Sequence, residues 1–280
     1  QPAKPAMSIV TISWGSLSSG LELAQKVAGR LGCRCLGREE LTEAAAKYGI
    51  PEIKLSELFE KKPTFWERLT ESRQRYLLIV RAAMFELAQS GPMVYHGQGG
   101  QTLLKDISHV LKVWAIASLE SRVKAAMHQG QPTREAALHH IRQIDEERLR
   151  RTRELFNVDW RDASLYDLVV NLQHMSMDAA VDAIVYLAEA PYYQPTAASQ
   201  RALDDMALAA RVRVALAIQE PAILDIDVRA DGGVVWLSGA VEGFDDSDAE
   251  EVVAVARRVP GVREVHSELK LKPVLPYLAP

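Results

Sequence analysis

The chain has 280 residues, of which 48% are hydrophobic and 25% charged, and its formal net charge is −4. These values are typical of a globular protein that is long enough for two domains. The slightly acidic balance argues against nucleic acid as a partner, and no apolar run approaches the roughly 20 residues that a membrane-spanning helix needs.

Two features bear on where the protein works. The segment Gln1–Ala6 carries one Lys and no apolar core, so we expect no signal peptide. The only cysteines, Cys33 and Cys35, lie two positions apart and are expected to be reduced thiols. We therefore predict a cytoplasmic protein. Two cysteines are too few for a zinc site and no other metal-ligand spacing occurs, so no metal site is predicted.

Strands and helices alternate through the first 190 residues. Apolar residues at helical spacing predict helices, and short apolar runs bounded by Gly or Pro predict strands. This alternation indicates an α/β domain with a parallel sheet and helices on both faces, in which ligands bind at the carboxyl ends of the strands. The predicted strands are 8–13, 33–36, 93–96, 110–117 and 165–171, and the predicted helices are 20–31, 39–48, 64–90, 119–129, 133–155 and 177–190.

The pattern changes after a linker at 191–200. A helix at 201–219 is followed by two strands, a second helix and a third strand, which gives a small α+β domain of order αββαβ. The turn Asp231-Gly232-Gly233 predicts a hairpin between the first two strands. We expect domains at 7–190 and 201–273. The remaining predicted elements are strands at 223–230, 234–241 and 262–271 and a helix at 246–258.

The segment 9–24 has the layout of a phosphate-binding loop: a buried strand, small residues and the start of a helix. Gly15 and Gly20 have the spacing of the two glycines in G-x-x-x-x-G-K-[ST]. The next residues are Leu21 and Glu22, where that motif has Lys and then Ser or Thr. The loop therefore has the spacing of a nucleotide site without its usual cation.

Phosphate can still be bound by such a loop through backbone N–H groups and the helix N-terminus. Ser16, Ser18 and Ser19 could add hydroxyl groups. These serines and the two glycines are our candidate nucleotide-binding residues in this loop, and the alternative is a turn that is kept only for packing.

The first 190 residues resemble the cytidylate kinase-like family of P-loop phosphotransferases. The resemblance implies a nucleoside-monophosphate-kinase fold, ATP with Mg²⁺ as cofactors, and a nucleotide or similar small molecule as acceptor. The family often has Arg directly after the strand-end Ser, where this chain has Trp14. Together with Leu21 and Glu22, this departure puts catalysis in doubt more than the fold. The matching segments are 13–24, Gly37–Leu41, Val94–Gly97, His109–Val113, Ile144–Arg148 and Val158–Leu168.

The last third of the chain, about 203–272, resembles a BON domain. This family is associated with the binding of phospholipids or other partners and has no catalytic residues to carry over. Residues 201–280 hold nine Lys and Arg against fourteen Asp and Glu, a balance poorly suited to anionic lipid headgroups. We therefore expect a protein or small-molecule partner rather than a membrane. The resemblance rests on Ala210–Leu216, Ile226–Val228, Gly233–Val241 and Val259–Val265.

An Arg-rich helix at 133–155 matches, by resemblance, the lid that closes over the phosphates in kinases of this fold. Arg142 and Arg148 are the arginines that we expect to point inward as catalytic cations. The alternative is a solvated helix whose arginines pair with neighbouring acidic residues. Arg122 follows a strand end and is either a nucleotide-binding residue or an ordinary surface arginine.

The acceptor side is expected near Arg38, His96 and Gly97, which follow two other predicted strands. His96 could bind a phosphate or act as an acid, or it could be a strand-end histidine held by the backbone. Glu39 and Glu40 could also belong to the acceptor site, although first-turn residues stabilised by the helix dipole explain them equally simply.

Two functions fit these observations. In the first, the chain is a kinase-like nucleotide-binding or regulatory protein with weak or no turnover, which acts through its BON module. In the second, it is an active nucleotide or small-molecule kinase in which lid arginines replace the missing Lys. A third and weaker interpretation is a scaffold, and the apolar face of helix 64–90 offers a surface for a homodimer.

Overall fold

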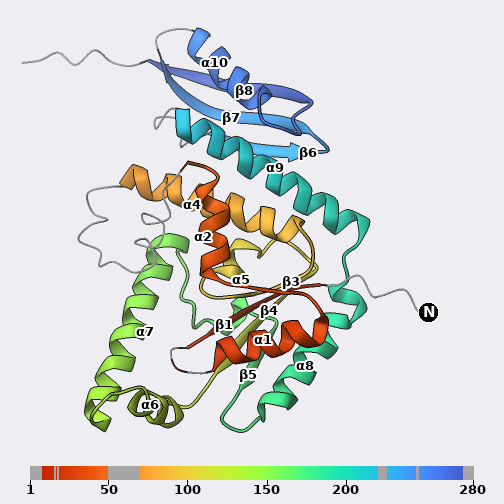
Figure 1. Ribbon diagram of the computed structural model, residues 1–280. Coiled ribbons are helices and arrows are strands. Elements are labelled where there is room, and N and C mark those ends of the chain that lie inside the picture. Colours follow the sequence, from red (N-terminus) through yellow and green to blue (C-terminus); the bar gives the residue numbers. More distant parts are fainter. Residues whose placement is uncertain are drawn as a thin grey trace, which may run out of the picture. The chain divides into compact units, whose positions relative to one another are not determined.

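The computed structural model describes residues 8–15, 17, 19–49, 70–219, 226–243 and 246–273. It divides into two compact units (Figure 1). Unit 1 takes its described residues from 1–41 and 90–199, and unit 2 takes its own from 42–89 and 200–280. Unit 2 therefore includes a helix from the middle of the predicted kinase-like segment, and each unit is described separately below.

Unit 1 is built on a five-stranded parallel sheet with the strand order β2-β3-β1-β4-β5. All described neighbours in it pair in parallel, as the alternating pattern predicted. Each residue of Ile9–Ser13 is buried, because helices cover both faces of the middle of such a sheet. The strands are β1 (Ile9–Trp14), β2 (Arg34–Leu36), β3 (Met93–His96), β4 (Val110–Ile116) and β5 (Leu168–Asn171).

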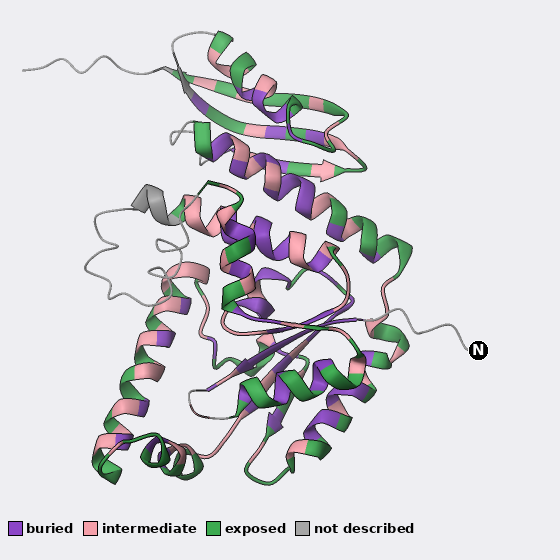
Figure 2. Cartoon of the chain, viewed as in Figure 1, coloured by how far each residue is buried: buried purple, intermediate pink, exposed green. Residues whose placement is uncertain are grey.

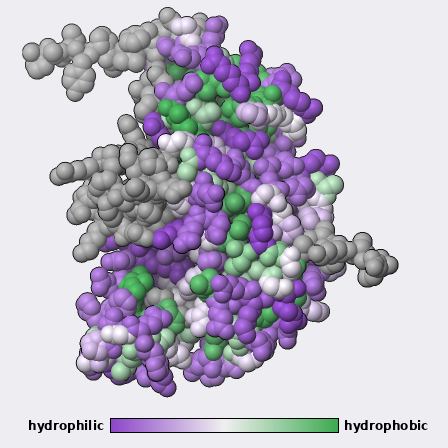
Figure 3. All heavy atoms as spheres, viewed as in Figure 1, coloured by the Kyte–Doolittle hydropathy of each residue, from purple (hydrophilic) through white to green (hydrophobic). Residues whose placement is uncertain are grey.

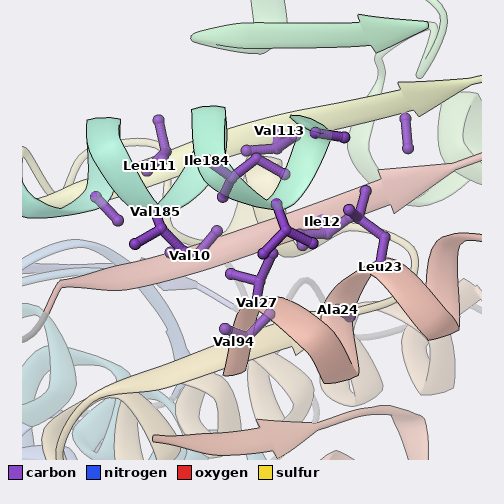
Figure 4. Close-up of a cluster of buried hydrophobic side chains, with 14 of the residues drawn as sticks. Val10, Ile12, Leu23, Ala24, Val27, Val94, Leu111, Val113, Ile184 and Val185 are labelled. Atoms are coloured by element: carbon purple, nitrogen blue, oxygen red, sulfur yellow. The ribbon is translucent and has the colours of Figure 1, made fainter. Parts of the chain in front are cut away.

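Helices α1 and α8 pack beside each other on one face of this sheet (Figure 1). Their apolar stripes meet the side chains of the central strands, as Figure 4 shows for Leu23 and Val27 of α1 and for Ile184 of α8. Figure 2 shows the central strands as the most buried part of the unit. The helices whose residues all fall within unit 1 are α1 (Gly20–Leu31), α5 (Gly100–Leu103), α6 (Leu119–His128), α7 (Arg134–Phe156) and α8 (Met177–Glu189), with short 3₁₀ turns at Ala163–Leu165 and Pro191–Tyr193.

Local signals explain where these helices begin and end. Ser118, Thr133 and Ser176 each accept a hydrogen bond from the backbone N–H three residues on and so cap α6, α7 and α8. Gly32, in the left-handed conformation, ends α1. The predicted loops at 14–20 and 97–100 follow the paired strands β1 and β3, and the Gly97 N–H donates to the Ile12 carbonyl at the end of this pair over 3.2 Å.

Unit 2 contains α4 (Thr70–Gln89), all but the first three residues of α9 (Ala197–Gln219) and a three-stranded sheet of order β6-β7-β8. The order α9-β6-β7-α10-β8 confirms the predicted αββαβ arrangement, with β6 and β7 antiparallel and β7 and β8 parallel. Gly232 and Gly233 have φ of 52° and 90°, as the predicted hairpin turn requires. The remaining elements are β6 (Asp227–Asp231), β7 (Val234–Gly243), α10 (Asp246–Arg257) and β8 (Glu264–Pro273); α2 (Arg38–Ala46) crosses the boundary between the units.

One expectation changes, one stays a prediction, and two predicted stretches lie outside the described residues. Residues 197–200 of the predicted linker already belong to α9, because Thr196 and Ser199 exchange side-chain-to-backbone hydrogen bonds of 2.9 and 3.0 Å and cap its start. The apolar face of α4 is buried within the chain at Val80 and Met84, and the homodimer stays a prediction. Residues 64–69 of the same predicted helix, and 223–225 of the predicted strand, lie outside the described residues.

The described helices include none that is both long and apolar enough to cross a membrane. On the face of the molecule that Figure 3 draws in colour, hydrophilic residues cover most of the surface and hydrophobic residues form small separate patches.

Candidate functional site

The predicted phosphate-binding loop connects β1 to α1 and is held by an apolar anchor. Leu17 has φ of 61° and Ser19 has φ of 55°, a conformation that side chains other than Gly rarely adopt. The Leu17 side chain packs against an apolar cluster between α6 and α7 that includes Ile141. This packing offsets the backbone cost, and it gives position 17 a structural role that the sequence analysis missed. Ser16 and Ser18 lie outside the described residues.

Four residues from four separate segments form a stacked column beside the loop. The Trp14 indole stacks on the His96 imidazole with 5.5 Å between ring centroids and 29° between planes. A Cβ added at Gly20 would lie 2.1 Å from the Trp14 ring, and one added at Gly37 would lie 2.6 Å from His96. A Cβ at either glycine would collide with the neighbouring ring. In space the order is therefore Gly20, Trp14, His96 and Gly37, closely packed against one another. We name these four residues the glycine–ring column.

Arg148 points inward, as expected, but its guanidinium already contacts other groups of the protein. It is 5% exposed, donates from Nη1 to the carbonyl oxygen of Trp14, and lies 4.0 Å from the centroid of the Trp160 ring. Burial lowers the pKa of Arg148 to about 10, so the group stays charged at neutral pH. Trp160 is fixed in turn because its carbonyl oxygen accepts from the Tyr166 hydroxyl over 2.7 Å. Arg148 thus joins α7 to the end of β1.

Arg122 also lies beside the loop. A Cβ added at Gly15 would be 3.7 Å from its Cζ, and its guanidinium donates to both carboxylate oxygens of Asp145 at 2.8 and 2.7 Å. The charge of Arg122 is therefore balanced by α7, and it is more than an ordinary surface arginine. Arg142, expected to point inward, is exposed instead, because it lies six positions before Arg148 and so on another side of the helix.

The acceptor-side residues follow β2 and β3. The Gly37 N–H donates to Glu40 Oε2 over 2.7 Å, so Glu40 closes the first turn of α2 and carries the structural role weighed above. Arg38 is the first residue of α2. Gly97 has φ of 148° beside the Tyr95 ring. Burial lowers the pKa of His96 below its usual 6.5, which favours the neutral imidazole that stacks on Trp14.

The loop fits phosphate groups better than it fits a metal ion. Ser19 makes no side-chain cap hydrogen bond at the start of α1, so its hydroxyl does not occupy the first-turn N–H groups, which are the donors that such loops offer to phosphate. Leu21 is 46% exposed and supplies no charge. Glu22 pairs with Lys26 at 3.9 Å and would repel a phosphate. Within the described residues, no group of three or more His, Cys, Asp or Glu side chains is placed to hold a metal ion.

These features define a nucleotide-kinase-like domain: a parallel sheet, a strand–loop–helix at its carboxyl edge, and an Arg-bearing helical segment beside that loop. Residues 9–174 match the family model of the cytidylate kinase-like family, and the chain belongs to this family. Residues 204–273 match the model of the BON domain.

Curated relatives and a solved structure agree with this assignment. A cytidylate kinase from Pyrobaculum islandicum is 26% identical over 62% of this chain and 89% of its own length. A cytidylate kinase from Methanothrix thermoacetophila is 29% identical over 58% of this chain and 87% of its own length. The crystal structure of an uncharacterized protein from Eubacterium ventriosum has a TM-score of 0.51 at 17% identity, covering 65% of this chain and 99% of that one, and supports the fold.

Proposed function

We propose that this chain is a nucleotide-kinase-like binding or regulatory protein, with weak or no phosphoryl transfer, coupled to a BON module that binds a ligand or protein partner. The observation that carries the proposal is that every arginine which the structure places beside the loop is already paired within the protein. Arg148 donates a hydrogen bond to the Trp14 carbonyl and contacts the Trp160 ring, and Arg122 donates to the Asp145 carboxylate. Position 21, where the motif has Lys, presents an exposed Leu.

The loop lacks the cation that the motif has at position 21, where this chain has Leu. Phosphoryl transfer needs cations on the β- and γ-phosphates, where negative charge develops. Loss of one charge-assisted contact in a desolvated site costs about 2–3 kcal/mol, or roughly 10²-fold. The backbone N–H groups of the loop can still attract a phosphate, so nucleotide binding can outlast turnover. The expected nucleotide-binding residues are Gly15, Ser16, Ser18, Ser19, Gly20 and Arg122.

The test is a gain of function. Calorimetric titration of the natural chain with ATP, ADP and CMP in the presence of Mg²⁺ measures binding, and a coupled assay with ATP and CMP measures turnover. The double variant Leu21→Lys/Glu22→Ser restores the motif and should raise turnover by about 10²-fold. Ile218→Lys is the matched control, because Ile218 is an apolar side chain of similar exposure, 48%, in the other unit. High turnover in the natural chain that the double variant does not raise would refute the proposal.

An active kinase is the second candidate, and one observation favours it: both Arg122 and Arg148 lie beside the loop, so a small rearrangement on binding could bring their guanidinium groups to a phosphate. The two relatives from Pyrobaculum and Methanothrix are also named cytidylate kinases. In this case Arg122→Ala should abolish an already high turnover. If turnover is high and neither Arg122→Ala nor Arg148→Ala reduces it, the arginine-replacement mechanism fails.

The proposal also includes the localisation, the domain bounds and the class of partner. We expect it to work in the cytoplasm, with domains at 7–190 and 201–273, and to use its acidic C-terminal module for a protein or small-molecule partner. The module's excess of acidic residues gives anionic lipid no favourable surface charge. Co-sedimentation with anionic vesicles should therefore leave the protein in the supernatant.

A further inference from the structure

Unit 2 contains a cavity of about 360 Å³ between α4, α9 and β6. Cavities of about 300–1,000 Å³ with apolar walls and a few polar groups are typical of small-molecule sites. The residues that line this one come from both family matches: Arg81 and Phe85 fall within 9–174, and Met206 and Val228 fall within 204–273. The cavity therefore depends on the two matched segments being in one chain.

The sequence of α9 explains why a hollow forms here. Ala202, Met206 and Ala209 follow one another at helical spacing and all line the cavity. The small side chains of Ala202, Ala209 and Ala210 leave a groove on α9, and the Phe85 ring of α4 lines it from the other side. The floor can thus receive a compact apolar group, which gains from leaving water.

The rim carries charges of both signs. Arg213 and Arg229 lie on one side and both contact Asp227, and Arg81 lies over the Phe85 ring at 5.5 Å. Asp231 and Asp205 also line the cavity. Asp227 does not line the cavity, but it pairs with two of these arginines, so with it three carboxylates balance the three guanidinium groups. An anion or a cation alone would leave one charge in excess. A ligand with both charges keeps the balance.

From the apolar floor and the balanced rim we propose that this cavity, the α4–α9–β6 pocket, binds a small zwitterion with an apolar body, such as an apolar α-amino acid. The carboxylate pairs with Arg81, since guanidinium and carboxylate match in geometry. The ammonium group is directed to Asp231 or Asp205, and the side chain enters the groove between Phe85 and Met206. Such a ligand would act as an effector that holds α4 against α9.

The experiment uses the full chain and L-phenylalanine as the probe, titrated by calorimetry. Two analogues divide its charges: 3-phenylpropionate keeps the carboxylate, and phenethylamine keeps the amine. We expect L-phenylalanine to bind at least about tenfold more tightly than either analogue, because each lacks one charge-assisted contact. Equal affinity for 3-phenylpropionate would overturn the assignment to a zwitterion, and no binding at concentrations up to about 10 mM would overturn the site.

Variants locate the site. Ala202→Trp fills the groove and should abolish binding, whereas Ala198→Trp, exposed on the same helix, should leave it unchanged. Arg81→Met should weaken binding about tenfold or more without touching the Asp227 pairs, and Arg201→Met is its exposed control. Far-UV circular dichroism confirms that each variant is folded. Binding that survives both Ala202→Trp and Arg81→Met would place the ligand elsewhere and refute the proposal.

Discussion

The glycine–ring column makes a specific prediction about Gly20. Its missing side chain is the space that the Trp14 indole occupies, because an added Cβ would lie 2.1 Å from Cγ and Cδ2 and 2.6 Å from Cβ of Trp14. Ordinary contact begins near 3.4 Å, so Gly20→Ala forces Cγ and Cδ2 of Trp14 to move by more than 1 Å. Overpacking of this kind costs about 2–3 kcal/mol.

The assay is a double-mutant cycle measured by urea unfolding at 25 °C. Trp14→Gly removes the three atoms nearest to the new Cβ, so adding Gly20→Ala to it should cost less than about 0.5 kcal/mol. The coupling free energy between the two positions is then about 2–3 kcal/mol. For a unit of this size, the Gly20→Ala change alone should lower Tm by about 5–10 °C.

Gly29 supplies the control on the same helix. A Cβ added there meets nothing within 4 Å, so Gly29→Ala should be neutral or stabilising by up to about 1 kcal/mol. If Gly20→Ala is as stable as the natural chain, or if it costs the same in the Trp14→Gly background, the indole does not pack on the backbone of α1 and the reasoning is refuted.

Three further predictions concern the surroundings of the loop. Arg148→Met should lower the free energy of unfolding by about 2–4 kcal/mol, since it removes a buried charged hydrogen bond and a cation–π contact. The exposed control Arg142→Met should change it by less than about 0.5 kcal/mol. Equal free energies of urea unfolding for the two variants would contradict a structural role of Arg148. Tyr166→Phe should cost about 1 kcal/mol by removing the donor to the Trp160 carbonyl, and an unchanged midpoint would count against that bond. Burial lowers the pKa of His96 and His109 below 6.5, so the unfolded chain binds more protons and stability should fall as pH drops from 6.5 towards the lowered values. In the buried-site variant His109→Leu this loss should be smaller than in the natural chain, whereas the exposed-site variant His128→Leu should retain it; identical pH profiles would refute the assignment.

Much of the fold could be predicted from the chain alone, because it depends on local patterns. Apolar runs bounded by Gly and Pro placed the strands of the parallel sheet, and helical spacing placed α1, α6, α7 and α8 to within one or two residues at each end. The Asp231-Gly232-Gly233 turn fixed the hairpin because both glycines take positive φ. The absence of Lys at position 21 and the excess of acidic residues in 201–280 are visible in the sequence itself.

Only the tertiary structure decided how the side chains are used, because contacts between distant segments leave no local period in the sequence. Arg142 and Arg148 look alike in the sequence, yet one is exposed and the other lies against Trp160. The stacking of Trp14 on His96 joins residues 82 positions apart, and the α4–α9–β6 pocket joins residues more than 100 apart. Local propensity sets the elements, whereas their packing determines which charges are already paired and therefore what the loop can do.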